Sequence, residues 1–252
     1  FHKFLNQYVW SIYELAFVLI EVIIKTLNIK EPLTFALDDT LIGKKGKHIF
    51  GCGIHFNHSA KQNESKYIYG HNWVFISLIH FSTLVSKWLC FPILAQLYIP
   101  QKYKPYNKEH ISRIDIAIQI LRKIKERIKS YFIIVADAFY AKEALLKHCI
   151  SNGIIFISRL RIDAVLYPKC RKRGRPRKYG IRLPSLMESS KRVSLFKRYT
   201  LFLYGKKVTI SLQTFTAYWK PAASIIRVLI VKYPNKKGIT CFFCTESSRF
   251  RK

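Results

Sequence analysis

Two apolar segments that each end in aspartate constrain the fold of this chain most strongly. Residues 33–39 read LTFALDD, so five largely apolar residues lead directly into Asp38 and Asp39. Residues 133–138 read IIVADA, so a second apolar segment leads into Asp137, and a helical pattern follows it. Short segments rich in Ile, Val and Phe are typical of strands. Because the ends of adjacent strands meet at one edge of a sheet, we expect these acids to converge there.

Converging carboxylates need a positive partner. Two ionised carboxylates repel each other unless a cation lies between them, and their hard oxygen ligands suit Mg²⁺ or Mn²⁺. Two such ions, held by Asp137 and by Asp38 or Asp39, would support phosphodiester displacement. The alternative is structural: Asp38 or Asp39 caps a turn, and Asp137 caps the helix that follows it.

The charge of the chain points to a polyanionic partner. Its 252 residues carry 44 Lys and Arg against 14 Asp and Glu, which gives a formal net charge of +30. Lys and Arg bind nucleic acids by neutralising phosphates and releasing counterions. An AT-rich genome also enriches Lys, Ile and Asn, so part of the charge reflects composition. We nevertheless expect a nucleic-acid partner, because the basic residues are clustered as well as numerous.

The N-terminal half combines a helix with long apolar strands. Residues 4–27 carry apolar positions at helical spacing, and Ser11 with Glu14 resembles a capping box. The apolar stretch 73–99 is interrupted by a lysine and a proline, and its uninterrupted pieces are short for a membrane span. It is therefore predicted to form two core strands joined by a turn at residues 82–87, and we expect no membrane partner.

Helices and strands then alternate. Residues 110–130 place Ile and Leu on one stripe and basic residues on the opposite face, which predicts an amphipathic helix. A strand is predicted over 131–138, a helix over 139–153 ending at its glycine, and a strand over 154–160. Three strands, a helix, a strand, a helix and a strand in this order indicate an α/β fold.

Cysteine and histidine patterns favour structural roles. The six cysteines are scattered and predict no disulfide framework, which suits a reducing cytoplasm. Cys241 and Cys244 form a lone CxxC in a strand-like segment, so a zinc site is the less favoured interpretation. His55 and His58 raise the same question and receive the same interpretation.

Residues 159–207 form a basic segment with 16 Lys and Arg against two acids. Within it, RKRGRPRK at 171–178 resembles an AT-hook, in which a proline holds the chain extended while arginines enter a narrow A·T minor groove. The alternative is a solvated loop that contacts phosphates without sequence preference. The residues assigned to DNA contact are Arg171, Lys172, Arg173, Arg175, Arg177 and Lys178.

Three lysines and a tryptophan are further candidates for DNA contact. Lys44, Lys45 and Lys47 follow the first acids closely, where they could hold a phosphate backbone or form a solvated turn. Trp219 looks exposed in FTAYWKP, where it could stack on a flipped base. A tryptophan of this kind more often belongs to the core.

Several motifs in this order resemble the DDE transposases of bacterial insertion sequences, and more narrowly the DDE superfamily endonucleases. They are LDDTLIGKKGKHIFGCGIHFNH, GHNWVFISLI, VADAFYAKEALL and FISRLRIDAVLY with GRPRKYG, and the resemblance spans about residues 4–245. It implies a ribonuclease-H-like mixed sheet flanked by helices, with a basic β-rich insertion after the fifth core strand. The domains expected are a helical segment (1–31), an incomplete catalytic core (32–158) and the insertion region (159–252).

The resemblance also implies a catalytic Asp–Asp–Glu triad that binds Mg²⁺ or Mn²⁺. The second acid maps onto Asp137, and the first onto Asp38 or Asp39, with Asp38 favoured because relatives often read Asp-Glu-Thr here. The third acid is a Glu on a helix after the insertion, and nothing in this chain matches it. We interpret Glu246 as a loop residue, so the chain is expected to end before that helix and to be inactive as given.

The expected function is that of a transposase fragment in the bacterial cytoplasm, associated with the nucleoid. It would bind double-stranded DNA at transposon ends and at the target, cleave with a metal-activated water, and join the 3′-hydroxyl to the target. Dimerisation is expected by analogy with the family alone. The alternatives are a noncatalytic DNA-binding remnant and an unrelated ribonuclease-H-like nuclease.

Overall fold

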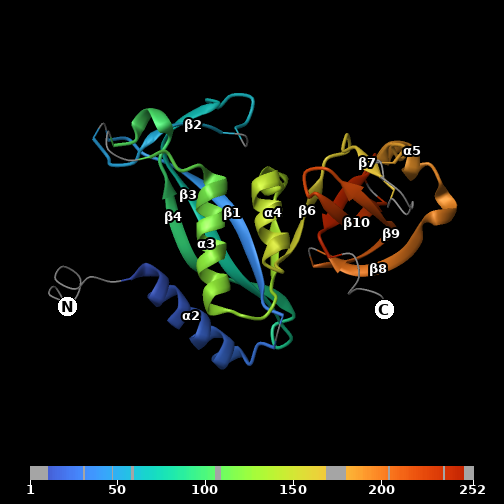
Figure 1. The fold of residues 1–252 in the computed structure, drawn as a ribbon, viewed down its shortest axis with the longest axis horizontal. Coiled ribbons are helices and arrows are strands. Elements are labelled where there is room, and N and C mark those ends of the chain that lie inside the picture. The colour runs from blue at the N-terminus through green and yellow to red at the C-terminus, as the bar shows by residue number, and fades with distance from the viewer. Residues whose placement is uncertain are drawn as a thin grey trace, which may run out of the picture. The chain divides into compact units, whose positions relative to one another are not determined.

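The computed structural model describes residues 11–30, 32–46, 48–57, 60–105, 109–168, 180–203, 205–234 and 236–246. The chain divides into two compact units, residues 1–133 (unit 1) and 134–252 (unit 2), which are coloured from blue to green and from yellow to red in Figure 1. Each unit combines helices with a sheet, so the predicted α/β class is confirmed. The boundaries predicted for a core and an insertion stay a prediction.

Unit 1 is built around its longest strand, β3. Strand β1 pairs with one side of β3, while β2 and β4 pair with successive parts of the other side, all antiparallel. The elements in chain order are α2 (Ile12–Leu27), β1 (Thr34–Gly43), β2 (Gly53–Phe56), β3 (Tyr67–Ser82), β4 (Lys87–Tyr98), η1 (Gln101–Tyr103) and α3 (Arg113–Arg127).

The N-terminal helix and the long hairpin form as the sequence predicts. Ser11 is the N-cap of α2 and accepts a hydrogen bond from the backbone N–H of Glu14, one of the two bonds of a capping box. The helix ends at Asn28 in the left-handed conformation, with φ of 48°. The apolar stretch after residue 72 forms β3 and β4, joined by a turn that contains Ser86 at φ 49°. Among the described residues, no helix is long and apolar enough to cross a membrane.

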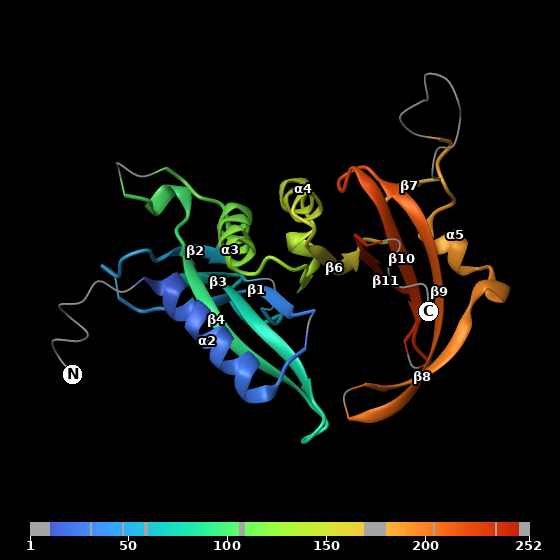
Figure 2. The same cartoon turned by 60° about the horizontal axis from the view of Figure 1, so that its bottom comes forward.

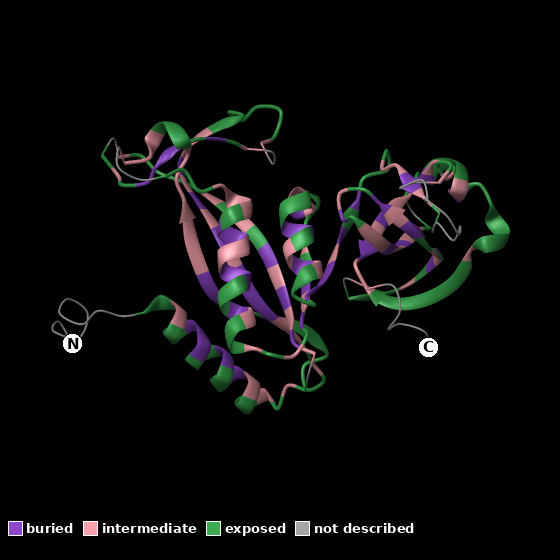
Figure 3. Ribbon diagram, in the orientation of Figure 1, coloured by how far each residue is buried: buried purple, intermediate pink, exposed green. Residues whose placement is uncertain are grey.

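The core of unit 1 lies between the sheet and α3. Phe35 and Leu37 of β1 are 0% and 1% exposed, and their partners across the ladder, Leu78 and Ile76 of β3, are both 0% exposed. Helix α3 presents its apolar stripe to this core, and Figure 3 shows these buried positions in purple. Burying an aliphatic or aromatic side chain of this size contributes about 1.5–3 kcal/mol. The residues of the stripe are Ile116, Ala117, Ile120, Leu121 and Ile124.

Strand β5 (Ile133–Ala136) links the two units in sequence. Within unit 1, the N–H of Ile133 donates to the carbonyl of Leu33 at 2.9 Å, so β5 starts beside the residue that precedes β1. The turn η2 (Ala138–Tyr140) and helix α4 (Glu143–Ser151) follow, and Gly153 at φ 65° ends the helical segment as predicted.

Unit 2 is dominated by antiparallel strands. Strands β6, β11, β10 and β9 are neighbours in that order, and both β7 and β8 pair with β9. The remaining elements in chain order are β6 (Ile155–Leu160), β7 (Leu166–Tyr167), α5 (Leu186–Ser190), η3 (Val193–Leu195), β8 (Lys197–Leu203), β9 (Lys206–Trp219), β10 (Ser224–Lys232) and β11 (Thr240–Cys244).

The structure corrects two sequence-based expectations. Strand β1 does not end at the two aspartates but continues through them to Gly43; what ends at Leu37 is its burial. Trp219 is not exposed: it is 9% accessible, and its ring centroid lies 4.9 Å from that of Phe243. A tryptophan packed this way belongs to the core of unit 2, which is where its large apolar ring is most stabilising.

Candidate active site

The two adjacent aspartates of β1 have different environments because strand side chains alternate between faces. Asp39 continues the row of Phe35 and Leu37, and it is partly buried. Asp38 lies on the opposite face and is exposed. Pairing with β3 holds both residues in a regular ladder, with Asp38 opposite Phe75 and Asp39 opposite Val74.

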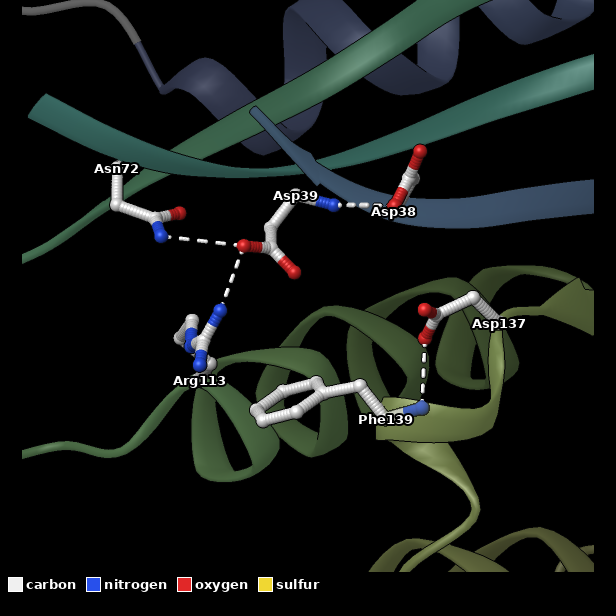
Figure 4. Close-up of polar contacts among 6 residues, drawn as sticks. All are labelled: Asp38, Asp39, Asn72, Arg113, Asp137 and Phe139. Carbon is white, nitrogen blue, oxygen red and sulfur yellow. Dashed lines mark hydrogen bonds and ion pairs between the residues drawn. The ribbon is translucent and has the colours of Figure 1, made fainter. Parts of the chain in front are cut away.

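The carboxylate of Asp39 is held by two side chains from other elements. Its Oδ2 accepts a hydrogen bond of 2.6 Å from Nη1 of Arg113 and one of 3.1 Å from Nδ2 of Asn72 (Figure 4). The side chains of Arg113 and Asp39 are 25% and 19% exposed, so this ion pair is largely shielded from water. A charge-assisted bond in such a setting is stronger than one on the surface.

Arg113 reaches Asp39 because it is the first residue of α3. Ser112 and Asp115 form a complete capping box, which fixes the start of the helix. The guanidinium carbon also lies 5.8 Å from the ring centroid of Tyr98, at the end of β4. The helix start, the strand end and the ion pair therefore hold one another in place.

His55 lies in the same region and is 8% exposed. Burial lowers the pKa of its imidazole, opposed by a hydrogen bond with the backbone of Gly70, and the charge of Arg113 lowers that pKa further. Its Nε2 and Oδ1 of Asn72 are buried and have no hydrogen-bond partner among the described residues. His58, the second histidine of the predicted pair, lies outside those residues.

Asp38 faces away from this cluster. Its Oδ1 accepts a hydrogen bond of 2.8 Å from the backbone N–H of Asp39 (Figure 4). Asp39 is engaged by a guanidinium, and a metal ion would have to compete with that cation for the same oxygen. That Asp38 rather than Asp39 is a metal ligand stays a prediction.

In unit 2, Asp137 follows β5 and caps the turn η2. Its Oδ1 accepts a hydrogen bond of 2.7 Å from the N–H of Phe139, and its backbone carbonyl accepts one of 2.9 Å from Oγ of Ser158. The carboxylate is exposed, and its Oδ2 accepts no hydrogen bond from the residues the structure describes. Capping thus uses one oxygen and fixes the direction of the other. That Asp137 and an acid of β1 share a metal ion stays a prediction.

Glu246 and Asp137 lie beside different parts of β6. Thr245 hydrogen-bonds to Phe156 through its N–H and its hydroxyl, at 3.0 and 2.9 Å, so Glu246 is level with the start of β6. Asp137 is bound instead to Ser158, further along that strand. At about 3.3 Å per strand residue the two positions are roughly 10 Å apart along β6. This geometry favours the interpretation of Glu246 as a loop residue.

The other predicted residues are distributed as follows. Lys44 and Lys45 are exposed just after β1, whereas Lys47 and the whole of 171–178 lie outside the described residues. Cys241 and Cys244 lie on β11, as predicted, and burial raises the pKa of both thiols. In the part of the chain that is described, no three His, Cys, Asp or Glu residues form a metal-binding group.

Arg113 and Asn72 were not predicted as site residues from the sequence. Asn72 carried a signal, because it is a polar residue at a position where the alternation of β3 points toward the core. Arg113 carried a weaker one, as the residue directly after a helix N-cap. Neither signal identifies Asp39 as the partner, since that contact joins three separate elements.

Comparison with known families identifies the chain. The model of the DDE superfamily endonucleases matches residues 1–200, which include β1 with its two aspartates and the Asp137 turn. The chain belongs to the DDE superfamily endonucleases. The comparison with curated proteins finds no match. Membership supports an activity of the nuclease or transposase type with DNA as the substrate, and enzymes of this superfamily typically use divalent metal ions.

Proposed function

We propose that this DDE superfamily endonuclease is the transposase of a bacterial insertion sequence, which cleaves transposon-end DNA and joins it to a target. The observation that carries the proposal is the separation of roles at the end of the buried part of β1. Asp39 is fixed by Arg113 and Asn72, and this anchors the backbone next to the exposed carboxylate of Asp38.

Asp38 and Asp137 suit a divalent metal ion. Both offer exposed carboxylate oxygens, and each is oriented by one backbone N–H, from Asp39 and from Phe139 respectively. Hard oxygen ligands of this kind bind Mg²⁺ or Mn²⁺. When bound, the ions would activate the attacking hydroxyl and stabilise the leaving oxygen.

Two groups of basic residues are proposed to bind the DNA. Lys44 and Lys45 are exposed one to two residues after β1 and are proposed to bind backbone phosphates. The segment 171–178 is proposed to bind DNA as well, with its Gly-Arg-Pro core in an A·T-rich minor groove. Trp219 has no part in this proposal, because it is buried against Phe243.

The test is metal-dependent cleavage of duplex DNA that carries the sequences flanking the gene, by the protein expressed from its complete reading frame. Asp38→Asn and Asp137→Asn are each expected to reduce cleavage at least 1,000-fold in Mg²⁺ or Mn²⁺ while DNA binding in EDTA persists. Asp163→Asn is the matched control, because Asp163 is an exposed acid of unit 2 that pairs with Arg161. It should leave cleavage unchanged.

Two results would contradict the assignment. Asp39 would be the metal ligand if Asp38→Asn cleaved DNA as well as the unaltered protein and Asp39→Asn lost cleavage without losing stability. DNA binding without cleavage under every metal condition would favour a noncatalytic DNA-binding protein. Glu246→Gln is expected to cleave normally, and loss of cleavage in this variant would assign Glu246 as the third acid.

A further inference from the structure

Strands β8 and β9 form a two-stranded ribbon at the margin of unit 2. Residues 206–212 of β9 pair with residues 197–203 of β8, and residues 211–219 of β9 pair with β10. The first five residues of β9 therefore pair with β8 alone. Figure 2 shows this hairpin extending below the other strands of unit 2. We call residues 197–203 and 206–212 the ribbon.

The ribbon has two chemically different faces. On one face, Ile210 of β9 is 5% exposed, and it lies opposite Tyr199 of β8, which is 45% exposed, so burial on this face is on the β9 side. The other face is polar and basic, and we call it the basic face. Its cross-strand pairs are Arg198 with Ser211, Thr200 with Thr209, and Phe202 with Lys207.

The basic face is ordered and open to solvent. The hydroxyl oxygens of Thr200 and Thr209 are 3.0 Å apart and form a hydrogen bond across its centre. Phe202 is 65% exposed and lies directly opposite Lys207. An exposed aromatic ring beside cations is a combination found where proteins contact nucleic acids.

Charge on the ribbon has one sign. It carries Arg198 and Lys207 on the basic face, Lys197 and Lys206 on the opposite face, and no acidic residue. None of these four forms an ion pair with the residues that the structure describes. Edge strands also carry lysines to prevent edge-to-edge association. That role alone does not explain why a large aromatic ring is exposed on the same face.

We propose that the basic face of the ribbon binds duplex DNA in the major groove. The groove of B-form DNA is about 12 Å wide and admits a two-stranded ribbon. Seven strand residues span about 23 Å, roughly two thirds of a helical turn. Duplex RNA fits less well, because its major groove is deep and narrow. The proposal deepens the proposed function, from which it takes DNA as the partner, and it adds a contact surface separate from the acids.

The test compares two doubly neutralised variants of the full chain. Arg198→Gln with Lys207→Gln removes two cations from the basic face. The matched control, Lys236→Gln with Lys237→Gln, removes two exposed lysines from the connection between β10 and β11. Binding to a fluorescent duplex is measured by anisotropy in EDTA over a range of salt concentrations, so cleavage plays no part. Unchanged circular dichroism and melting temperature establish that both variants fold.

We expect the ribbon variant to bind about tenfold more weakly and to lose up to about 1.8 from the slope of log affinity against log salt. The control variant should keep nearly the same affinity and the same salt slope as the unaltered protein. Dimethyl sulfate reports the groove, because guanine N7 lies in the major groove. The unaltered protein should protect guanines from methylation, and the ribbon variant should not.

Three outcomes would overturn the proposal: equal effects of the two double variants, full guanine protection by the ribbon variant, or equal affinity for duplex RNA. None of them bears on cleavage. A different result would contradict the proposed function alone: the unaltered protein shows no cleavage that depends on Asp38 and Asp137, while the ribbon variant still binds DNA more weakly than the control. The ribbon would then remain a DNA-binding surface.

Discussion

Arg113 and Asp39 are 74 positions apart in the chain, and Nη1 of the arginine donates a hydrogen bond of 2.6 Å to Oδ2 of the aspartate. The bond joins the first residue of α3 to the strand that carries the candidate catalytic acid. It satisfies a carboxylate and a guanidinium that are both mostly shielded from water. It also gives Asp39 a structural role, and Asp38 is the aspartate proposed for chemistry.

Stability should separate these two aspartates. Asp39→Asn leaves the Arg113 guanidinium without its counter-charge, so we expect a loss of about 1–3 kcal/mol in the free energy of unfolding. Asp38→Asn removes an exposed carboxylate and should change stability by less than about 0.5 kcal/mol. Urea denaturation measures both values. Equal losses, or a larger loss for Asp38→Asn, would contradict the division of roles.

Metal binding can be located without catalysis. Fe²⁺ that replaces Mg²⁺ generates hydroxyl radicals in the presence of ascorbate and peroxide, and these cut the polypeptide next to the ion. We expect cuts near residues 38 and 137 that excess Mg²⁺ suppresses. Asp137→Asn should abolish both sets of cuts, because the sequence predicts that the two carboxylates hold the same ions. Cuts that persist in this variant at residue 38 would argue against a shared site.

The stability of unit 1 should depend on pH through His55. Burial lowers the pKa of this imidazole below its usual value of 6.5. As the pH falls, His55 therefore binds a proton at a higher pH in the unfolded chain than in the folded chain. The free energy of unfolding should therefore fall as the pH falls below about 6.5 toward the lowered pKa. His55→Gln should reduce that dependence. His48→Gln is the control, since His48 is exposed. The melting temperature of this variant should depend on pH in the same way as that of the unaltered protein.

Cysteine reactivity should report the packing of β11. Burial raises the pKa of Cys149 to about 12 and that of Cys241 to about 11, whereas Cys90 is exposed. Iodoacetamide at pH 8 should therefore modify Cys90 well before Cys149, Cys241 and Cys244, as peptide mass mapping would show. Rapid alkylation of Cys241 and Cys244 in the folded protein would mean that the CxxC is accessible.

The local pattern of the sequence was enough to predict several elements. The apolar stripe of α3 has helical period, so a helix was predicted over 110–130 without any distant contact, and the structure begins it at Arg113. The turn between β3 and β4 is likewise marked by polar residues between two apolar segments. Asp137 at the end of β5 was found by the same reasoning.

The sequence by itself thus determined the amphipathic helices, the long hairpin and the positions of the candidate acids, because period and capping act within a few residues. Only the tertiary structure separated Asp38 from Asp39, since the partners of Asp39 come from β3 and α3. Only the tertiary structure placed Trp219 in a core and left Phe202 exposed on a strand of equally apolar appearance. The physical reason is that burial depends on which elements pack against a face, and those elements are distant in the chain.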